Sequence, residues 1–506
     1  MIALAELKSF ARAAAGLVAR ERDVAQFEIY CASADHRVAR LNYTSDIPSR
    51  GVEEMKSLHT DGFQVRLAMR RDPHETGSAF EASDLSLDAV RAALERARRS
   101  AVVDPHFPGF ASSPGKLSAG PAGASDLARA GDGALAACAW QAVSGAMRVF
   151  HSLEAAAPAH PGLVIGGDVS IIRDRIAVAN SNFAAVRADE GAHFSSSVTA
   201  LVESLDAKGT ASALGNSIAA MRAGCASLGR DAVRRALQLR HGVRPPSGAY
   251  RVVLGPQPVA EILNYMVLGS LTTGAFFAAS SAYQGHFGDR VMDARLALAD
   301  DPAFKSGAVR RRITCEGLPA KKVDLIRDGK LVGLFSNFYD SHRLRTDEDR
   351  REKLGPLGDG ADFPPLNGYR LGEGAGRRFD AHPGSAGTNV IMRARGGVGD
   401  RELLRAAGDG IYIGRVWYTY PINGQRAGDF TCTVSGDSHM IRNGELAEPL
   451  APNSLRINAN IAQVFGSPLA IARRSSPAIV WGSSEAYYVP AIAVGGIELA
   501  EVGAPG

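Results

Sequence analysis

Hydrophobic spacing in the first half of the chain alternates between a helical and a strand-like period. Leu87, Val90 and Leu94 recur every three or four residues, which predicts an amphipathic helix with Ser86 as its N-cap. Residues 63–69 alternate apolar and polar side chains instead, which predicts a strand with one buried face. Further helices are expected at residues 5–22, 135–150 and 217–239, and a hairpin at 163–181. Residues 1–240 therefore predict a mixed α/β domain.

The second half shows short apolar runs and few helical patterns. Asx-Gly pairs separate several of the runs, and such a pair is a strong hairpin signal. These pairs are Asp328-Gly329, Asn367-Gly368, Asn423-Gly424 and Asn443-Gly444. We expect a β-rich domain over residues 250–506, antiparallel and barrel- or sandwich-like, and a Pro/Gly-containing linker at 241–249. The fold class is then α+β.

Composition narrows the class of protein. Glycine accounts for 55 of 506 residues, above the usual share of about 7%, as a turn-rich β domain would require. The 57 Lys and Arg nearly balance the 53 Asp and Glu, which disfavours a nucleic-acid-binding protein. The five cysteines are isolated, so no disulfide framework or zinc ribbon is expected. No apolar stretch reaches the about 18 residues of a membrane span, and charges interrupt the amphipathic N-terminus. We expect a soluble cytoplasmic protein.

The segment after Pro258 is the most informative single element. Its apolar residues follow helical spacing and predict a fully buried core helix. They are Val259, Ile262, Leu263, Met266, Val267 and Leu271. Glu261 and Asn264 fall off this stripe and could be exposed or face a cleft. No H-E-x-x-H, G-x-S-x-G, Walker or G-x-G-x-x-G motif occurs, so the residues alone leave the function open.

The order of several weak motifs is more specific than any one of them. They fall at residues 62–69 with 77–86, 246–256, 315–334, 428–446 and 494–496. In this order they resemble the TldD/PmbA family, also called modulators of gyrase or peptide-maturation proteases. Residues 428–446 are similar to the signature of its PmbA/TldE-like branch. The resemblance covers roughly residues 20–500.

The resemblance also implies which residues to inspect for a metal site. The active branch of the family carries H-E-x-x-x-H on the helix that follows the 250–254 strand, and a late cysteine completes a zinc site. The matching positions here are Asn264, Tyr265 and Gly269, and no cysteine follows Cys432. The resemblance therefore implies a branch without the metal motif, with no catalytic residue and no cofactor in this chain, and with zinc in a partner subunit.

Two hypotheses about function follow. In the first, the chain is the non-catalytic TldE-type pseudoenzyme subunit of a two-component metallopeptidase that acts in proteolysis or peptide maturation. It forms a heterodimer with a TldD-type subunit and binds the peptide, or a homodimer when alone. In the second, it is a stand-alone enzyme or binding protein with a repurposed cleft for a peptide-like molecule. The family signature makes five residues candidates for peptide binding: Gly428, Asp429, Phe430, Ser435 and Gly436.

Overall fold

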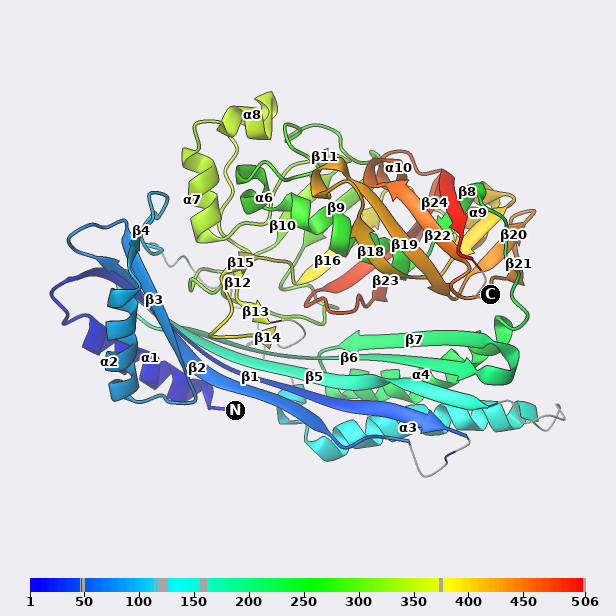
Figure 1. The fold of residues 1–506 in the computed structure, drawn as a ribbon, viewed down its shortest axis with the longest axis horizontal. Helices are drawn as coiled ribbons and strands as arrows, with labels where there is room; N and C mark the ends of the chain where they lie inside the picture. The colour runs from blue at the N-terminus through cyan, green and yellow to red at the C-terminus, as the bar shows by residue number, and fades with distance from the viewer. Residues whose placement is uncertain are drawn as a thin grey trace.

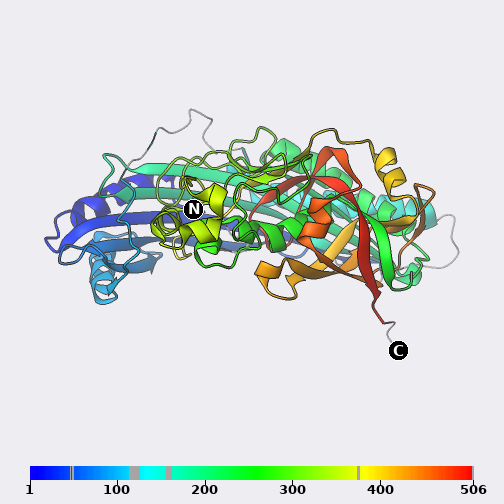
Figure 2. The ribbon, with the colours of Figure 1, turned by 90° about the horizontal axis from the view of Figure 1, so that it is seen from above.

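The computed structural model describes residues 1–45, 47, 51–112, 115, 126–154, 162–372 and 376–503. A long sheet with helices on one face forms the first half of the chain, and a β-rich half lies on its other face (Figure 1). Seen from above, the second half extends along the long strands (Figure 2). The expected α+β class is confirmed.

The first half contains a seven-stranded sheet in the order β4-β3-β2-β1-β5-β6-β7, in which every neighbouring pair is antiparallel. Its strands are β1 (Val24–Thr44), β2 (Lys56–Met69), β3 (Glu75–Ala82), β4 (Val102–Val103), β5 (Leu163–Asn180), β6 (Arg187–Val202) and β7 (Ala207–Gly215). Its helices are α1 (Leu4–Val18), α2 (Leu87–Arg99), α3 (Asp132–Glu154) and α4 (Ile218–Gln238), with the short 3-10 turns η1 (Asp126–Arg129) and η2 (Glu203–Leu205). Ser86 caps α2 as predicted, because its side chain accepts a hydrogen bond from the Ala89 N–H.

The two faces of the long strands pack against different partners. On β1, Ile29 and Cys31 pack with residues of α1 and α2. Tyr30 and Ala32, which point the other way, pack with Ile313 and other residues of the second half. Burial on both faces explains why β1 and β5 are long and largely apolar.

The hairpin expected at residues 163–181 is wrong, because this segment is one continuous strand, β5. Gly166 and Gly167 lie inside this strand. A Cβ atom at Gly167 would lie 2.0 Å from the Ser197 carbonyl oxygen of β6. Glycine is therefore needed here for the close approach of two strands rather than for a chain reversal.

The second half is built on a thirteen-stranded mixed sheet. Its strands are β8 (Gly248–Leu254), β9 (Leu296–Asp300), β10 (Val323–Arg327), β11 (Lys330–Leu331), β16 (Asn389–Ala394), β17 (Gly410–Ile413), β18 (Arg415–Pro421), β19 (Asp429–Gly436), β20 (His439–Arg442), β21 (Glu445–Pro449), β22 (Leu455–Asn460), β23 (Ala470–Ala478) and β24 (Ala486–Glu501). Most pairs are antiparallel, but β16 with β24 and β8 with β17 are parallel. The expected β-rich second half is confirmed, but its sheet is mixed and open rather than antiparallel and barrel-like.

Small elements complete this half. Two-stranded sheets join β12 (Gly368–Tyr369) to β15 (Gly384–Ser385) and β13 (Leu371–Gly372) to β14 (Gly376–Arg377). The helical segments are α5 (Pro256–Ile262), η3 (Leu263–Val267), η4 (Leu268–Leu271), α6 (Thr273–Phe277), α7 (Phe338–Thr346), α8 (Arg350–Leu354), η5 (Pro356–Gly358), α9 (Asp400–Ala407), η6 (Gln425–Ala427) and α10 (Ile461–Gly466). Within the described ranges, no helix is both long and apolar enough to cross a membrane.

Three of the four Asx-Gly pairs lie between consecutive strands. Asp328-Gly329 joins β10 to β11 and Asn443-Gly444 joins β20 to β21, with positive φ at both residues of each pair. Asn423-Gly424 lies between β18 and β19. Asn367-Gly368 is different, because Gly368 begins β12 and the buried Asn367 amide donates to Asp300 at 3.2 Å. Asn367 therefore forms a hydrogen bond in the core and does not form a hairpin turn.

Buried ion pairs connect the two halves. Arg377 of β14 is 1% exposed and binds Asp174 of β5 and Asp189 of β6. Arg370, fully buried, contacts Glu28 of β1. Charges buried this deeply are stable only when each has its partner, so these pairs fix how the second half sits on the sheet.

Candidate functional site

The predicted core helix after β8 contains a π-helical turn. It runs through α5, η3 and η4, and the six apolar residues of its predicted stripe are all completely buried. The turn at η3 is of the π type, a local insertion that is frequent at functional sites. Gln425 supports it, because its Nε2 donates to the Met266 carbonyl at 2.7 Å.

The three positions that correspond to the metal motif lie on this π turn and just after it. The Asn264 Oδ1 accepts a hydrogen bond from the Tyr487 hydroxyl at 2.6 Å. Tyr265 is 37% exposed and its hydroxyl donates to the Trp481 carbonyl at 2.9 Å. Gly269 is exposed and has no side chain.

These residues do not fit a zinc ion. Zinc in proteins takes thiolate, imidazole or carboxylate ligands, and an amide that already accepts from a tyrosine is a poor substitute. In the part of the chain that the structure describes, no three His, Cys, Asp or Glu side chains are grouped so that they could hold a metal. Cys432, the last cysteine, is buried in the core.

Glu261 is the carboxylate nearest in sequence to these positions, one helical turn before Tyr265. It is 5% exposed and its Oε2 accepts from Gln257 at 3.0 Å. Burial raises its pKa to about 7, although Arg415 and the Gln257 hydrogen bond pull it down. Such a group can give or take a proton near neutral pH. The helical spacing placed Glu261 off the apolar stripe, exposed or facing a cleft. Its burial could not be read from that spacing and is seen only in the packed structure.

A cleft of about 400 Å³ lies between the long sheet and the second half, and Trp481 in its lining accepts the hydrogen bond from Tyr265 of this helix. We call it the interdomain cleft. Its floor is the face of β1, β5, β6 and β7, which is rich in small polar side chains and histidines. They include His36, Ser170, His193, Ser195, Ser196, Ser197 and Ser212. Its other wall is the segment 479–486 with Arg415. The volume is within the usual range for ligand pockets.

Aromatic side chains gather where segment 479–486 meets the π turn. Trp481 is 73% exposed, and its ring centroid lies 6.1 Å from that of Trp417. Tyr418, next to Trp417, is 70% exposed and has a φ of +55° at an irregularity in the β18–β19 pairing. A non-glycine residue in this backbone region is unusual and is often associated with function. Trp481 lines the cleft, and its contact with Trp417 gives the cleft an aromatic border on this side.

The five candidate peptide-binding residues lie in or next to β19. This strand pairs with β18 on one side and β22 on the other, so a peptide cannot add to it by backbone pairing. Phe430, Ser435 and Gly436 are buried, and Gly428, also buried, has a φ of +72°. Asp429 accepts from Asn460 and Asn423 at 2.8 and 2.9 Å. None of the five is among the lining residues of the interdomain cleft. Their role in peptide binding stays a prediction.

Comparison with known proteins identifies the family. Residues 247–501, half of the chain, match the model of the PmbA/TldA metallopeptidase C-terminal domain. No curated protein matches the sequence. The fold is similar to the crystal structure of TldE from Thermococcus kodakarensis, with a TM-score of 0.77 and 15% identity over 98% of this chain and 100% of that one.

Two further solved structures share the fold. A protein described as a modulator of DNA gyrase from Bacteroides thetaiotaomicron gives a TM-score of 0.71 and 15% identity, covering 98% of this chain and 99% of that one. A second protein with the same description, from Thermotoga maritima, gives a TM-score of 0.72 and 14% identity. The match covers 97% of this chain and 99% of that one. Because the C-terminal family model matches half of the chain and the motifs occur in the family's order, the chain belongs to the PmbA/TldD family.

Proposed function

We propose that this chain is the TldE-type, non-catalytic subunit of a two-component peptidase, in which a TldD-type subunit carries the zinc. The observation that carries the proposal is the chemistry of the motif positions: Asn264 and Tyr265 are neutral and already bonded within the chain, and Gly269 has no side chain. The likeness to TldE of Thermococcus kodakarensis agrees with it at the level of the fold.

In this proposal the interdomain cleft holds an extended peptide. Its polar floor offers hydroxyl and imidazole groups that can bind the peptide backbone. Its aromatic border offers flat, rigid apolar surfaces for side chains, the kind of residue that dominates binding energies. The chain then contributes recognition, and the TldD-type subunit contributes the chemistry.

Reconstitution tests the assignment. The chain should co-purify from its native host with a TldD-type protein at a 1:1 ratio, as mass spectrometry can verify. Fluorescein-labelled casein should be cleaved only when both chains are present, and a zinc chelator should stop cleavage. Cleavage by this chain alone, undiminished by the chelator, would refute the proposal.

Trp481→Ala should weaken peptide binding without disturbing assembly. Loss of an exposed tryptophan at a binding surface typically costs about 1–2 kcal/mol, so the KM of the reconstituted complex for labelled casein should rise about tenfold. Trp140, 49% exposed on α3 on the opposite face of the sheet, provides the matched control Trp140→Ala, which should leave KM unchanged. Size-exclusion chromatography checks that both variants still pair with the partner. An unchanged KM for Trp481→Ala would argue that the peptide lies elsewhere.

A second candidate function, a stand-alone enzyme with a repurposed cleft, is favoured by one observation. Glu261 has a pKa raised to about 7 by burial, and Arg415, which acts on it electrostatically, lines the interdomain cleft. In this alternative Glu261→Gln would abolish an activity of the isolated chain, whereas the TldE-type assignment expects the reconstituted peptidase to keep its activity in that variant.

A further inference from the structure

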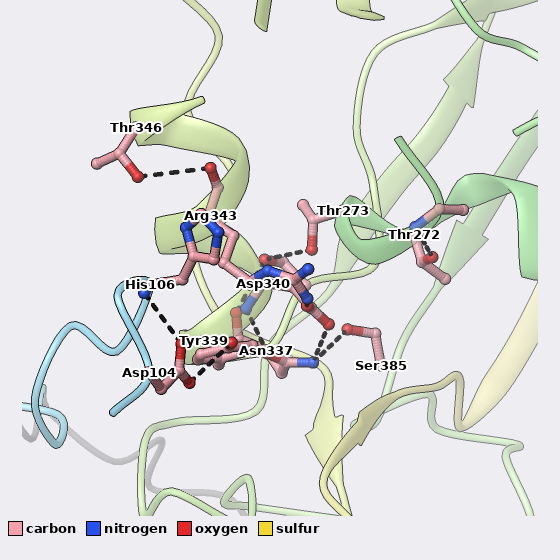
Figure 3. A network of polar contacts seen from close by, with 12 residues as sticks. Asp104, His106, Thr272, Thr273, Asn337, Tyr339, Asp340, Arg343, Thr346 and Ser385 are labelled. Atoms are coloured by element: carbon pink, nitrogen blue, oxygen red, sulfur yellow. Dashed lines mark hydrogen bonds and ion pairs between the residues drawn. The ribbon is translucent and has the colours of Figure 1, made fainter. Parts of the chain in front are cut away.

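A second cavity, of about 360 Å³, also lies between the two halves and shares no lining residue with the interdomain cleft. The long sheet contributes Glu28 and Arg66, the loop after β4 contributes Asp104, and the second half contributes Glu316, Asp340 and Arg343. Figure 3 shows the polar network on its α7 side, where Asp104, Tyr339 and Asp340 lie close together. We call it the amine cavity, for the ligand argued below.

The charges that line this cavity do not balance. Four carboxylates face two guanidinium groups, and Tyr339 and His382 are further titratable side chains of the lining. Arg370, just outside the lining, adds a third positive charge through its pair with Glu28. Arg66 pairs with Glu28 at 3.2 Å and Arg343 pairs with Asp340 at 3.3 Å. Asp104 and Glu316 are left without an ion pair among the described residues.

The surroundings of these two carboxylates differ from those of the paired ones. The Asp104 Oδ2 accepts from the Tyr339 hydroxyl at 2.9 Å, a neutral donor. Glu316 is only 6% exposed; its Oε1 accepts from the Phe338 N–H at 3.2 Å, and its Oε2 has no hydrogen-bond partner. Burial, together with the charge of Glu28, raises the pKa of Glu316, and an ammonium group in the cavity would stabilise its charged form.

Aromatic rings in and beside the cavity already bind positive charge. The Arg66 guanidinium lies 5.2 Å from the centroid of Phe110, and that of Arg343 lies 5.0 Å from Tyr339 and 3.8 Å from Phe277. Ring faces of this kind attract cations and also accept alkyl chains. The described carboxylates and histidines nowhere form a group of three that could hold a metal, so the cation that fits is organic.

We propose that the amine cavity binds a primary ammonium group carried on a short alkyl chain, with Glu316 and Asp104 as its counter-charges and the aromatic rings against the chain. The cavity volume is near the lower end of the range for ligand sites, which suits a molecule of amino-acid size. The ammonium group belongs to a free amine or to a lysine side chain of a peptide.

Calorimetric titration of the full chain with 1,5-diaminopentane tests this site, with 1,5-pentanediol as the uncharged analogue. The diamine should bind and the diol should not. Glu316→Gln and Asp104→Asn should each weaken diamine binding about tenfold or more, the usual cost of losing a charged hydrogen bond. Asp104 lies in a half-exposed loop, so its variant keeps the test valid if Glu316→Gln does not fold. Asp400→Asn, at an exposed position on α9, is the control and should bind normally.

A blocked tripeptide with a central lysine separates the two sources of the amine. Tighter binding of the tripeptide than of the diamine identifies a peptide side chain, and the reverse order identifies a free amine. The proposal is overturned if the wild-type chain binds neither compound, if the diol binds as well as the diamine, or if both carboxylate variants bind the diamine like the wild type.

Discussion

Arg377→Met is expected to lower the free energy of unfolding by about 3–5 kcal/mol at neutral pH, the usual cost of removing one partner from a buried ion pair. The guanidinium of Arg377 donates to Asp174 from Nε at 2.9 Å and from Nη2 at 2.7 Å, and to Asp189 from Nη1 at 2.7 Å. Without it, two carboxylates that are 6% and 2% exposed lose their counter-charge.

The loss of stability in Arg377→Met should depend on pH. Burial alone would raise the pKa of Asp174, but Arg377 and Arg311 hold it below its usual value. Asp174 therefore stabilises the wild-type fold above the unfolded pKa, and this stability is lost as pH falls through the folded pKa. In the variant the carboxyl can take up a proton, so the difference from wild type should shrink toward pH 4. Urea unfolding followed by circular dichroism at pH 4, 5.5 and 7 measures the difference in free energy of unfolding between wild type and variant.

The neighbouring Arg378 provides a matched control. Its side chain is 22% exposed and pairs with Asp380 outside the core. Arg378→Met should cost at most about 1 kcal/mol, as for surface ion pairs. Adding Asp174→Asn and Asp189→Asn to Arg377→Met should recover part of the loss, because the unpaired charges are then gone. Equal losses for Arg377→Met and Arg378→Met would contradict this account.

Glu261→Gln is expected to stabilise the chain by up to about 3 kcal/mol above pH 7. Burial raises the folded pKa of Glu261 from 4.5 to about 7. Between these values the unfolded chain releases the proton and the folded chain retains it, so the wild type loses stability as pH rises from about 4.5 to 7. Glutamine avoids this loss and can keep the hydrogen-bonding pattern with Gln257.

Thermal unfolding from pH 4.5 to 8.5 measures the effect, which should be near zero at the acid end and level off above pH 7. Glu498→Gln, at an exposed position on β24, is the control and should show no such trend. A stabilisation of Glu261→Gln that is the same at every pH would mean that the folded carboxyl titrates as an ordinary one does.

The sequence correctly predicted those helices and strands that are determined by the spacing of neighbouring residues. Alternation over residues 63–69 predicted both faces of β2: Phe63, Val65 and Leu67 are in the helix-covered core, and Arg66 reaches the amine cavity. The hairpin predicted at residues 163–181 is instead one strand, because both faces of β5 are buried, one under the helices and one under the second half. That packing comes from distant parts of the chain and leaves no local signal.

The two cavities could not be predicted from the sequence, because residues far apart in the chain line them. Arg370 and Glu28 are 342 positions apart, and the interdomain cleft combines β1 with a loop near residue 481. Family motifs directed attention to Asn264 and Tyr265, and the Tyr265 hydroxyl donates to the carbonyl of Trp481, which lines the interdomain cleft. They also pointed to β19, whose signature residues the structure places inside a paired strand.

The length of β1 sets the distance between the two cavities. Glu28 lines the amine cavity and His36 lines the interdomain cleft, on the same face of one unbroken strand. The eight steps along the strand from Glu28 to His36 correspond to roughly 26 Å at about 3.3 Å per residue. Tyr30, Ala32 and Ala34 lie between them on this face and are buried, with Tyr30 and Ala32 packed against the second half, so no extended ligand can run along β1 from one cavity to the other. Ligands in the two cavities would therefore bind independently of each other.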